Sequence, residues 1–534
     1  MKHPAATVTV ALLCLTLALP VSASQQQSSP ELTVQDGALR DSAGRQIFLW
    51  GMNVGEKSAS RQHRGWYGRQ DFQNLRRWGM NAIRLLIFWS AIEPEPGRYD
   101  EDYLASVDET VALARDAGLY VILDMHQDLW GASIPGGNGA PPWATLDDGL
   151  PHFTAGSVWS TAYYVSPRVH RVFDHFWNNT PGPGGIGIQE RFARMWRHVA
   201  SHYKNTPHVI GFDLMNEPFP GSSIQDTMPA LWEVFPKILQ DVSTPASWQA
   251  WMNSITEKPL PPWLLEALDD PVRHRQVLKA IQPVMERFEQ ERLMPMYRRV
   301  HAAIREVHPS AILFLEPCVL ANIGVPTAIE ALCNAAGERD PLQAYLPHAY
   351  DIVTDTSLSP QPSENRLNMI VEQKHHDAER LGMPILIGEW GAYYGAPETR
   401  DAARMMHRLL AQHTSGAFYW DYHRNIEQAP YFEILARPAP LALAGALDSW
   451  TFSPESATFQ CVWQNNPGPA AESRFALPAF WPAETMAMRV EPAELIARIE
   501  TDPHNSAVRT VTVTNPGASG RATLTLALPQ STLP

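Results

Sequence analysis

Apolar runs of strand length alternate with helical patterns along most of this chain, and this alternation constrains the fold more than any other feature. Eight runs read as strands, near 46–53, 81–89, 119–126, 209–215, 311–317, 347–350, 384–391 and 416–420. Segments with helical periodicity near 71–78, 100–118, 188–203, 276–307, 367–381 and 400–412 separate most of them. Repeated β-then-α units predict a parallel sheet, and eight of them predict a closed (β/α)8 TIM barrel. An open doubly wound sheet is the weaker alternative, because no Gly-rich phosphate turn follows the first strand.

The pattern changes past about Arg437, where helical periodicity fades. Short alternating runs separated by turn residues follow, at 449–452, 458–463, 486–490, 508–513 and 522–526. Such runs are typical of a β-sandwich. We therefore predict a catalytic barrel over residues 31–437 and a β-sandwich domain over 438–534, which either caps the barrel or helps at a membrane or micelle surface.

The first residues resemble a secretory signal peptide. A weakly basic start is followed by an apolar run from Val8 to Leu19 and small residues to Ala23. A membrane anchor is less consistent with the run, which falls short of the roughly 20 apolar residues that a span needs. We predict a signal peptide over residues 1–23 and a secreted protein, extracellular or periplasmic.

Composition and cysteine content narrow the possible functions. The net charge of -14 argues against nucleic-acid binding, which needs a basic surface. Three cysteines remain after residue 23: Cys318, Cys333 and Cys461. A Cys318–Cys333 disulfide and free thiols are both compatible with the sequence, and no cysteine spacing resembles a zinc site.

Two predicted strands end on a glutamate. The run from Val209 breaks at Asn216-Glu217-Pro218, and the run from Pro384 ends on Glu389. Barrel enzymes keep their chemistry at the carboxyl ends of their strands. The two strand ends therefore predict a pair of carboxylates in one site.

The other strand ends carry further polar or aromatic side chains, namely Arg84, Asp124, His126, Glu316, His348, Tyr350 and Trp420. This set is typical of glycoside hydrolysis, in which one carboxylic acid protonates the leaving oxygen and a second carboxylate attacks or positions water. Proximity of two carboxylates raises the pKa of one of them. We expect Arg84 to keep the other ionised, and Trp420 to offer a flat platform for a sugar ring.

These residues together resemble glycoside hydrolase family 5. Three segments, at 123–130, 173–179 and 212–221, resemble the endoglycoceramidase branch more narrowly, as does the trailing β-domain. The resemblance runs from about residue 35 to the end. Two departures are Trp390, where we expect phenylalanine, and a long tryptophan-rich insertion after Gly221.

The resemblance implies a retaining mechanism without metal or cofactor. Glu217 would be the general acid/base and Glu389 the nucleophile. Asn216 would bind the sugar 2-hydroxyl, and His348 and Tyr350 would orient the carboxylates. The glucose subsite would be lined by Lys57, Asp124, His126 and Trp420, and the insertion over 220–270 would form a wall for the lipid.

Each of these assignments has a structural alternative. Asp124, His126 and Asp128 have the side chains of metal ligands, but a hydrogen-bond network at the end of the barrel is the better interpretation of these three residues. Lys57 would be an exposed loop lysine, Glu316 a buried carboxylate with a structural role, and His375-His376 a solvated helix face. The tryptophans of the insertion, at 232, 248, 251 and 263, would simply pack it onto the barrel.

We therefore predict a secreted endo-β-glycosidase that cleaves the bond between glycan and ceramide in glycosphingolipids. Alternatives are another family 5 enzyme, acting on steryl glucosides, a β-glucan or a mannan, or a non-catalytic protein that binds carbohydrate or lipid. The expected partner is a glycolipid or glycoside substrate and not nucleic acid. Transient contact with a membrane or micelle surface stays open, and we expect a monomer.

Overall fold

The computed structural model describes residues 32–529 apart from a few gaps. The residues left out within this range are 156–157, 242–243, 245, 248–249, 251–260, 357, 360, 467–471, 503–504, 515–516 and 518. The predicted signal peptide and two tryptophans of the insertion, Trp248 and Trp251, lie outside the described residues.

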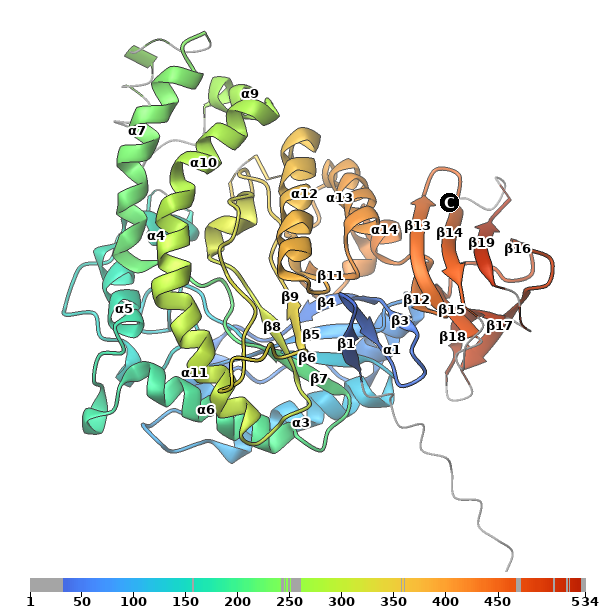
Figure 1. The fold of residues 1–534 in the computed structure, drawn as a ribbon, viewed down its shortest axis with the longest axis horizontal. Helices are drawn as coiled ribbons and strands as arrows, with labels where there is room; N and C mark the ends of the chain where they lie inside the picture. The colour runs from blue at the N-terminus through green and yellow to red at the C-terminus, as the bar shows by residue number, and fades with distance from the viewer. Residues whose placement is uncertain are drawn as a thin grey trace, which may run out of the picture.

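Eight parallel strands form the sheet that the sequence predicts. In sheet order they are β10 (Ile387–Gly391), β11 (Gly416–Trp420), β4 (Leu49–Val54), β5 (Ala82–Ile87), β6 (Tyr120–Met125), β7 (Val209–Asp213), β8 (Ile312–Leu315) and β9 (Gln343–Tyr345). Parallel bridges from Tyr345 to Ile385 and from Ala349 to Trp390 join the two ends of this sheet. The predicted (β/α)8 barrel is thereby confirmed (Figure 1).

Helices surround the barrel and connect its strands. They are α1 (Arg69–Arg77), α2 (Trp89–Ile92), α3 (Glu101–Asp116), α6 (Ile188–Tyr203), α10 (Pro271–Phe288), α11 (Met294–Arg305), α12 (Glu364–Leu381), α13 (Thr399–His413) and α14 (Phe432–Leu435). The single long helix expected near 276–307 is interrupted by a π-helical turn, Glu289–Leu293, between α10 and α11. Such turns insert one extra residue and often occur at functional sites.

The barrel interior is filled by one or two apolar side chains from each strand. This buried cluster includes Leu49, Ala82, Ile122, Ile210, Ile312, Phe314, Ala344, Leu346, Leu386 and Phe418. Because side chains alternate between the two faces of a strand, a residue two positions further on points to the same interior. Arg84, Asp124 and Glu316 stand in that relation to Ala82, Ile122 and Phe314, so these polar groups lie above the apolar layer at the carboxyl ends of the strands.

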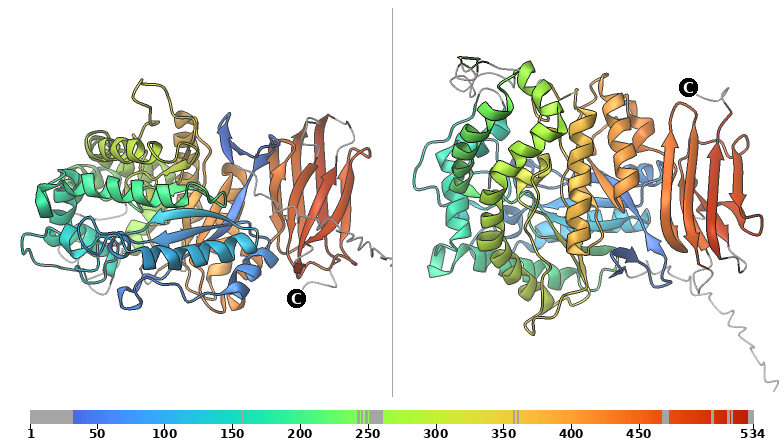
Figure 2. Two further views of the ribbon diagram at one scale, coloured as in Figure 1. Left: turned by 90° about the horizontal axis from the view of Figure 1, so that it is seen from below. Right: turned by 45° about the horizontal axis from the view of Figure 1, so that its top comes forward.

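Two antiparallel sheets form the C-terminal part of the molecule, beside the barrel (Figures 1 and 2). One contains β13 (Gly445–Ser453), β14 (Thr458–Asn465), β19 (Gly520–Ala527) and β16 (Ala487–Glu491). The other contains β1 (Thr33–Gln35), β2 (Ala38–Arg40), β3 (Gln46–Ile47), β12 (Ala439–Leu443), β15 (Glu472–Leu477), β18 (Asn505–Thr514) and β17 (Ile496–Asp502). The N-terminal strands thus pair with the C-terminal sheet, through Ile47 opposite Ala442.

Two long connections follow β6 and β7. The first, after Gln127, carries α4 (Ala162–Val165) and α5 (Pro167–Trp177). The second carries α7 (Thr227–Ile238) and α9 (Pro262–Asp269), which pack on α10 around a small apolar cluster that includes Phe235, Leu264 and Leu268.

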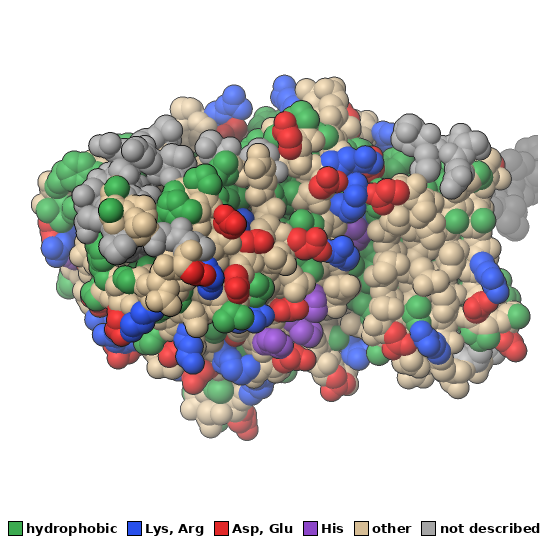
Figure 3. Space-filling view, turned by 90° about the horizontal axis from the view of Figure 1, so that it is seen from above, with side chains coloured by type: hydrophobic (Ala, Val, Ile, Leu, Met, Phe, Trp, Pro, Cys, Tyr) green, Lys and Arg blue, Asp and Glu red, His purple; other side chains and the backbone are tan. Residues whose placement is uncertain are grey.

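The insertion has both a packed side and an exposed side. Trp232 on α7 is 42% exposed and Met228 is 37% exposed. Figure 3 shows hydrophobic side chains at the surface of this end of the molecule. Within the described part of the chain, no helix combines the length and the apolar character needed to cross a bilayer.

The three described cysteines are free thiols in this structure. Cys318 and Cys461 are buried, whereas Cys333 is exposed. Of the two alternatives left by the sequence, the structure thus contains free thiols and not a Cys318–Cys333 disulfide.

Candidate active site

Arg84 lies at the centre of the site and is completely buried. Its guanidinium contacts four carboxylates within 3.0 Å, those of Asp124, Asp213, Glu316 and Glu389. It also donates to the side-chain oxygens of Asn53 and Asn216, each at 2.9 Å. A planar guanidinium with five N–H donors suits such a cluster, because one side chain fixes several oxygens at once.

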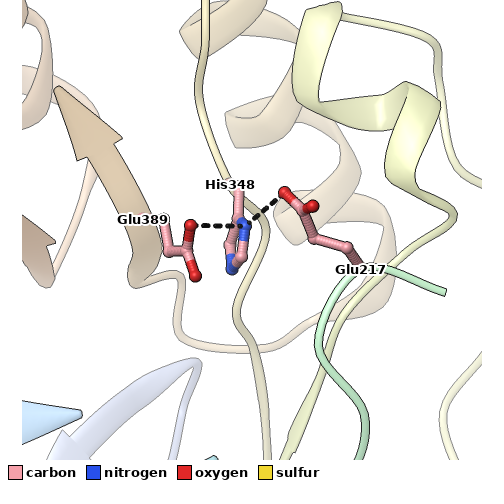
Figure 4. Close-up of side chains that lie close together, drawn as sticks. All are labelled: Glu217, His348 and Glu389. Carbon is pink, nitrogen blue, oxygen red and sulfur yellow. Dashed lines mark hydrogen bonds and ion pairs between the residues drawn. The ribbon is translucent and has the colours of Figure 1, made fainter. Parts of the chain in front are cut away.

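The two predicted glutamates face each other across His348 (Figure 4). His348 Nδ1 lies 2.9 Å from Glu217 Oε1 and 3.5 Å from Glu389 Oε2. One carboxylate oxygen of each glutamate lies within 4.8 Å of the other. Tyr350 donates its hydroxyl to Glu389 Oε2 at 3.0 Å, while Arg84 holds Glu389 Oε1. Both oxygens of Glu389 are therefore fixed in direction.

Burial decides the charge state of this centre. It raises the pKa of Glu389 to about 7, against the lowering effect of His348 and Arg84 and with a further rise from the Glu217 charge. The sequence led us to expect that Arg84 would hold its carboxylate ionised; the contact is present, but the cost of burying the charge exceeds its effect. Burial lowers the pKa of His348, yet Glu316 and Glu389 raise it well above its ordinary value, so this imidazole carries a positive charge.

The backbone at Glu217 has an unusual conformation, with a φ of 45°. A non-glycine residue in this region is uncommon and is often found at functional sites. Glu316 Oε2 accepts the Glu217 N–H at 2.9 Å, and Gln127 Nε2 donates to the Glu217 carbonyl at 3.2 Å. Glu316 is thus a buried carboxylate with satisfied contacts, and it also positions the backbone of Glu217.

The predicted sugar-binding residues form one wall of the site. The His126 ring stacks on the Trp420 ring, with centroids 5.3 Å apart and planes 14° apart. Lys57 Nζ lies 4.9 Å from the Trp420 centroid and 2.5 Å from Asp128 Oδ2. Lys57 is therefore part of the site and not an isolated loop lysine.

A hydrogen-bond network connects this wall to the barrel interior. Asp124 Oδ2 lies 2.8 Å from His126 Nδ1, and Asp128 Oδ2 lies 3.6 Å from His126 Nε2. Burial lowers the pKa of His126, but Asp124 and Asp128 raise it to about 9. The ring is thus held as a cation that orients two carboxylates, which agrees with the network interpretation of Asp124, His126 and Asp128.

Two groups of described residues have the spacing of metal ligands: Asp124, Asp213 and Glu316, and Glu217, His348 and Glu389. The first surrounds the Arg84 guanidinium, and the second contains the charged imidazole of His348. Side chains of the protein thus already supply positive charge at both places.

The structure brings all ten predicted site residues into one site and adds three that the sequence analysis did not select. Asn53 and Asp213 contact Arg84, and Asn322 donates its amide to Glu217 Oε1 at 2.6 Å. Asp213 had a detectable signal, because it is a charged residue inside an apolar strand. Asn53 also had a signal, because it is a polar residue at the end of the first predicted strand. Asn322 has no comparable signal, since it lies in a turn after β8.

Comparison with protein families gives two matches along the chain. A family described as cellulase, glycosyl hydrolase family 5, matches residues 41–426. A glycoside hydrolase family 5 C-terminal domain matches residues 437–525.

Several characterised proteins are similar to part of this chain. Endoglycoceramidase I of Rhodococcus hoagii is 33% identical over 206 residues, which are 38% of this chain and 40% of that protein. Endoglycoceramidase of Cyanea nozakii is 32% identical over 215 residues, or 35% of this chain and 41% of that protein. The chain thus spans about two fifths of the length of these relatives.

Solved structures match over a larger share of the chain. Endo-glycoceramidase II from Rhodococcus sp. superposes with a TM-score of 0.69 at 26% identity, covering 92% of this chain and 99% of the other. Its complex with ganglioside GM3 gives a TM-score of 0.69 at 25% identity, covering 93% and 100%. Cryptococcus neoformans sterylglucosidase 1 shares the fold, with a TM-score of 0.67 at 15% identity and coverage of 94% and 97%.

Proposed function

The chain belongs to glycoside hydrolase family 5, and from this premise we propose that it is a retaining endo-β-glycosidase that hydrolyses the bond between glycan and ceramide in glycosphingolipids. The observation that carries the mechanism is that one carboxylate oxygen of Glu217 and one of Glu389 lie within 4.8 Å of each other. Retaining glycosidases hold their carboxyl groups about 5–5.5 Å apart, whereas inverting enzymes leave about 6.5–9.5 Å for a water molecule. The short separation favours direct attack by one glutamate.

The first step forms a bond from Glu389 to the anomeric carbon. Arg84 and Tyr350 hold the two oxygens of Glu389, so that the ionised carboxylate is oriented for attack. Glu217 donates its proton to the glycosidic oxygen as the bond to the leaving group breaks. The product of this step is a glycosyl ester on Glu389 and a free ceramide hydroxyl.

The second step restores the enzyme. Glu217, now ionised, takes a proton from a water molecule that attacks the anomeric carbon and displaces Glu389. His348 is charged and lies between the two glutamates, so it stabilises the ionised form of either one. The configuration at the anomeric carbon is retained after two inversions.

The glycosphingolipid substrate is supported by the relatives and by one surface of the molecule. Curated relatives named endoglycoceramidase are similar in sequence, and a neighbour solved with ganglioside GM3 has a similar fold. The exposed apolar side chains of α7, Met228 and Trp232, are suited to an acyl or sphingoid chain.

A glucanase is the second candidate, because the family description that matches the barrel is that of a cellulase. A steryl β-glucosidase is the third, since a yeast ergosteryl-beta-glucosidase is 33% identical over 111 residues. Either activity would use Glu217 and Glu389 in the same roles and would differ from the first proposal in the group bound on the aglycone side.

Export, assembly and membrane contact are part of the same proposal. The sequence over 1–23 supports secretion to the periplasm or the extracellular space. We propose that the enzyme acts as a monomer and contacts its lipid substrate transiently at a membrane or micelle surface.

The test compares three substrates: a glucosylceramide-based ganglioside, a steryl glucoside and cellulose. Release of an intact glycan from the ganglioside supports the proposal, and cleavage of cellulose alone contradicts it. Glu389→Gln should abolish turnover of every substrate, whereas Glu291→Gln, at an exposed position, should leave it unchanged. Full activity of Glu389→Gln would remove the nucleophile assignment.

A further inference from the structure

A single asparagine outside the predicted site connects the two catalytic glutamates. Asn322 lies in the short 3-10 turn Val319–Ile323 that follows β8, and it is buried. Its side-chain Nδ2 donates to Glu217 Oε1 at 2.6 Å. Its backbone carbonyl accepts the N–H of Tyr350 at 3.1 Å, and the Tyr350 hydroxyl donates to Glu389.

The contact with Glu217 distinguishes the two oxygens of that carboxyl group. Oε1 accepts from Asn322 Nδ2 and lies 2.9 Å from His348 Nδ1, which also carries a proton because the imidazole is charged. A proton on Oε1 would face two donors and would repel them. The proton of the acid form therefore belongs on Oε2, the oxygen that remains to reach the leaving group.

The turn that carries Asn322 is held from behind by Glu289. This residue begins the π-helical turn between α10 and α11 and is buried. Its carboxylate accepts the N–H of Cys318 at 2.8 Å, the N–H of Ala328 at 2.5 Å and the hydroxyl of Thr327 at 2.9 Å.

A buried lysine on the neighbouring helix completes the support. Lys374 on α12 donates a hydrogen bond from its Nζ to the carbonyl of Ala321, the residue before Asn322. The start and the middle of the turn are thus anchored to buried side chains, which hold the Asn322 amide in place beside Glu217.

We propose that Asn322 is a positioning residue that places the catalytic proton of Glu217 on Oε2. This inference rests on the proposed function, because it assumes that Glu217 is the general acid. Removal of the Asn322 amide leaves the backbone carbonyl, and therefore the Tyr350 contact, in place. Its effect should fall on acid catalysis alone.

The test uses two substrates with the same sugar and different leaving groups. Octyl β-lactoside releases an alkoxide that needs a proton, whereas dinitrophenyl β-lactoside releases a stable phenolate that does not. General acid catalysis contributes about 10²–10⁴-fold. Asn322→Ala should lower kcat/KM for the octyl glycoside by about 30-fold and for the dinitrophenyl glycoside by less than about 3-fold.

Asn322→Asp provides a second variant of nearly the same volume that replaces the donor with an acceptor, and it should show the same difference between substrates even if the alanine variant folds poorly. Asn365→Ala is the matched control, because Asn365 also donates to a carboxylate, that of Asp269, but at the surface. It should leave both rates unchanged.

The outcomes separate this inference from the proposed function. Wild-type cleavage of both lactosides together with equal losses, or no loss, in the Asn322 variants would overturn the positioning role alone. A wild-type protein that cleaves neither lactoside nor the ganglioside would overturn the proposed function and with it the role of Asn322.

Discussion

Arg84 Nη1 lies 2.9 Å from Glu389 Oε1, and both side chains are buried. The same guanidinium contacts Asp124, Asp213 and Glu316, so it joins four buried carboxyl groups. Burial and the charge of Glu316 raise the pKa of Asp213 well above its ordinary value, which reduces the negative charge that Arg84 must balance.

Arg84→Lys should therefore impair both stability and catalysis. Lysine keeps the charge but offers three donors from one atom, which cannot reach the six oxygens that Arg84 contacts. We expect the free energy of unfolding to fall by about 3 kcal/mol, because buried carboxylates lose their partner. We also expect kcat to fall at least about 100-fold, since Glu389 loses its orientation. Urea unfolding and steady-state kinetics measure the two effects.

Arg197→Lys is the control for this change, because Arg197 makes an exposed contact with Glu306 at 2.7 Å. Exposed ion pairs contribute about 0–1 kcal/mol, so this variant should resemble the wild type. Wild-type stability and activity of Arg84→Lys would contradict the central role of the guanidinium.

The acid side of the pH–rate profile should report the ionisation of Glu389. Burial raises the pKa of this nucleophile to about 7, and attack requires the ionised form. Below pH 7 the ionised fraction falls about tenfold per pH unit, so kcat/KM should fall by the same factor. Dinitrophenyl β-lactoside is the suitable substrate for measuring this side of the profile, because its phenolate leaves without a proton from Glu217. A rate that stays constant down to about pH 5 would contradict the prediction.

The alternation of apolar strands and helices was sufficient to predict the barrel and most of its site. Parallel strands converge at one end, so residues such as Arg84, Glu217 and Glu389 could be assigned to one site from strand ends alone. The expected helix over 188–203 agrees with α6. These features follow from local periodicity, and local periodicity is visible in a sequence.

Features that depend on distant contacts were not visible. Strands β1 to β3 are two or three residues long. They pair with one another in order, and β3 joins them to β12, nearly 400 residues later. Asn322 contacts Glu217 from a turn that is held by Glu289 and Lys374, which lie far from Glu217 in the sequence. No pattern of adjacent residues encodes such contacts.

Glu389 should also make the stability of the protein depend on pH. Its folded-state pKa of about 7 exceeds the value of about 4.3 for an unperturbed glutamate. Between these two pKa values the folded state therefore holds a proton that the unfolded state releases. The stability that this proton contributes is complete below about pH 4.3 and is lost as the pH rises through 7. Glu389→Gln has no such proton to lose. The free energy of unfolding of this variant, relative to that of the wild type, should therefore rise by up to about 3–4 kcal/mol between about pH 4 and pH 8.

Urea unfolding at a series of pH values measures this difference. Glu291→Gln, at an exposed position, should follow the wild type at every pH. If Glu389→Gln and the wild type keep a constant difference in stability across this range, Glu389 ionises in the folded protein as it does in the unfolded chain.

The contact between Trp50 and Trp450 predicts that the barrel and the β-sandwich unfold together. Trp50 belongs to β4 and Trp450 to β13, and their rings lie 5.3 Å apart. The Arg437 guanidinium lies over both rings, at 5.2 and 5.5 Å.

Trp450→Ala should lower the free energy of unfolding by about 3–5 kcal/mol, the usual cost of deleting a buried indole. Calorimetry should show one transition at a lower temperature, because the lost contact is shared by both parts. Phe480→Ala, at a position 48% exposed, is the control and should change the transition temperature little. Two separate transitions, with only the sandwich affected, would instead show that the sandwich is an independent unit that merely adjoins the barrel.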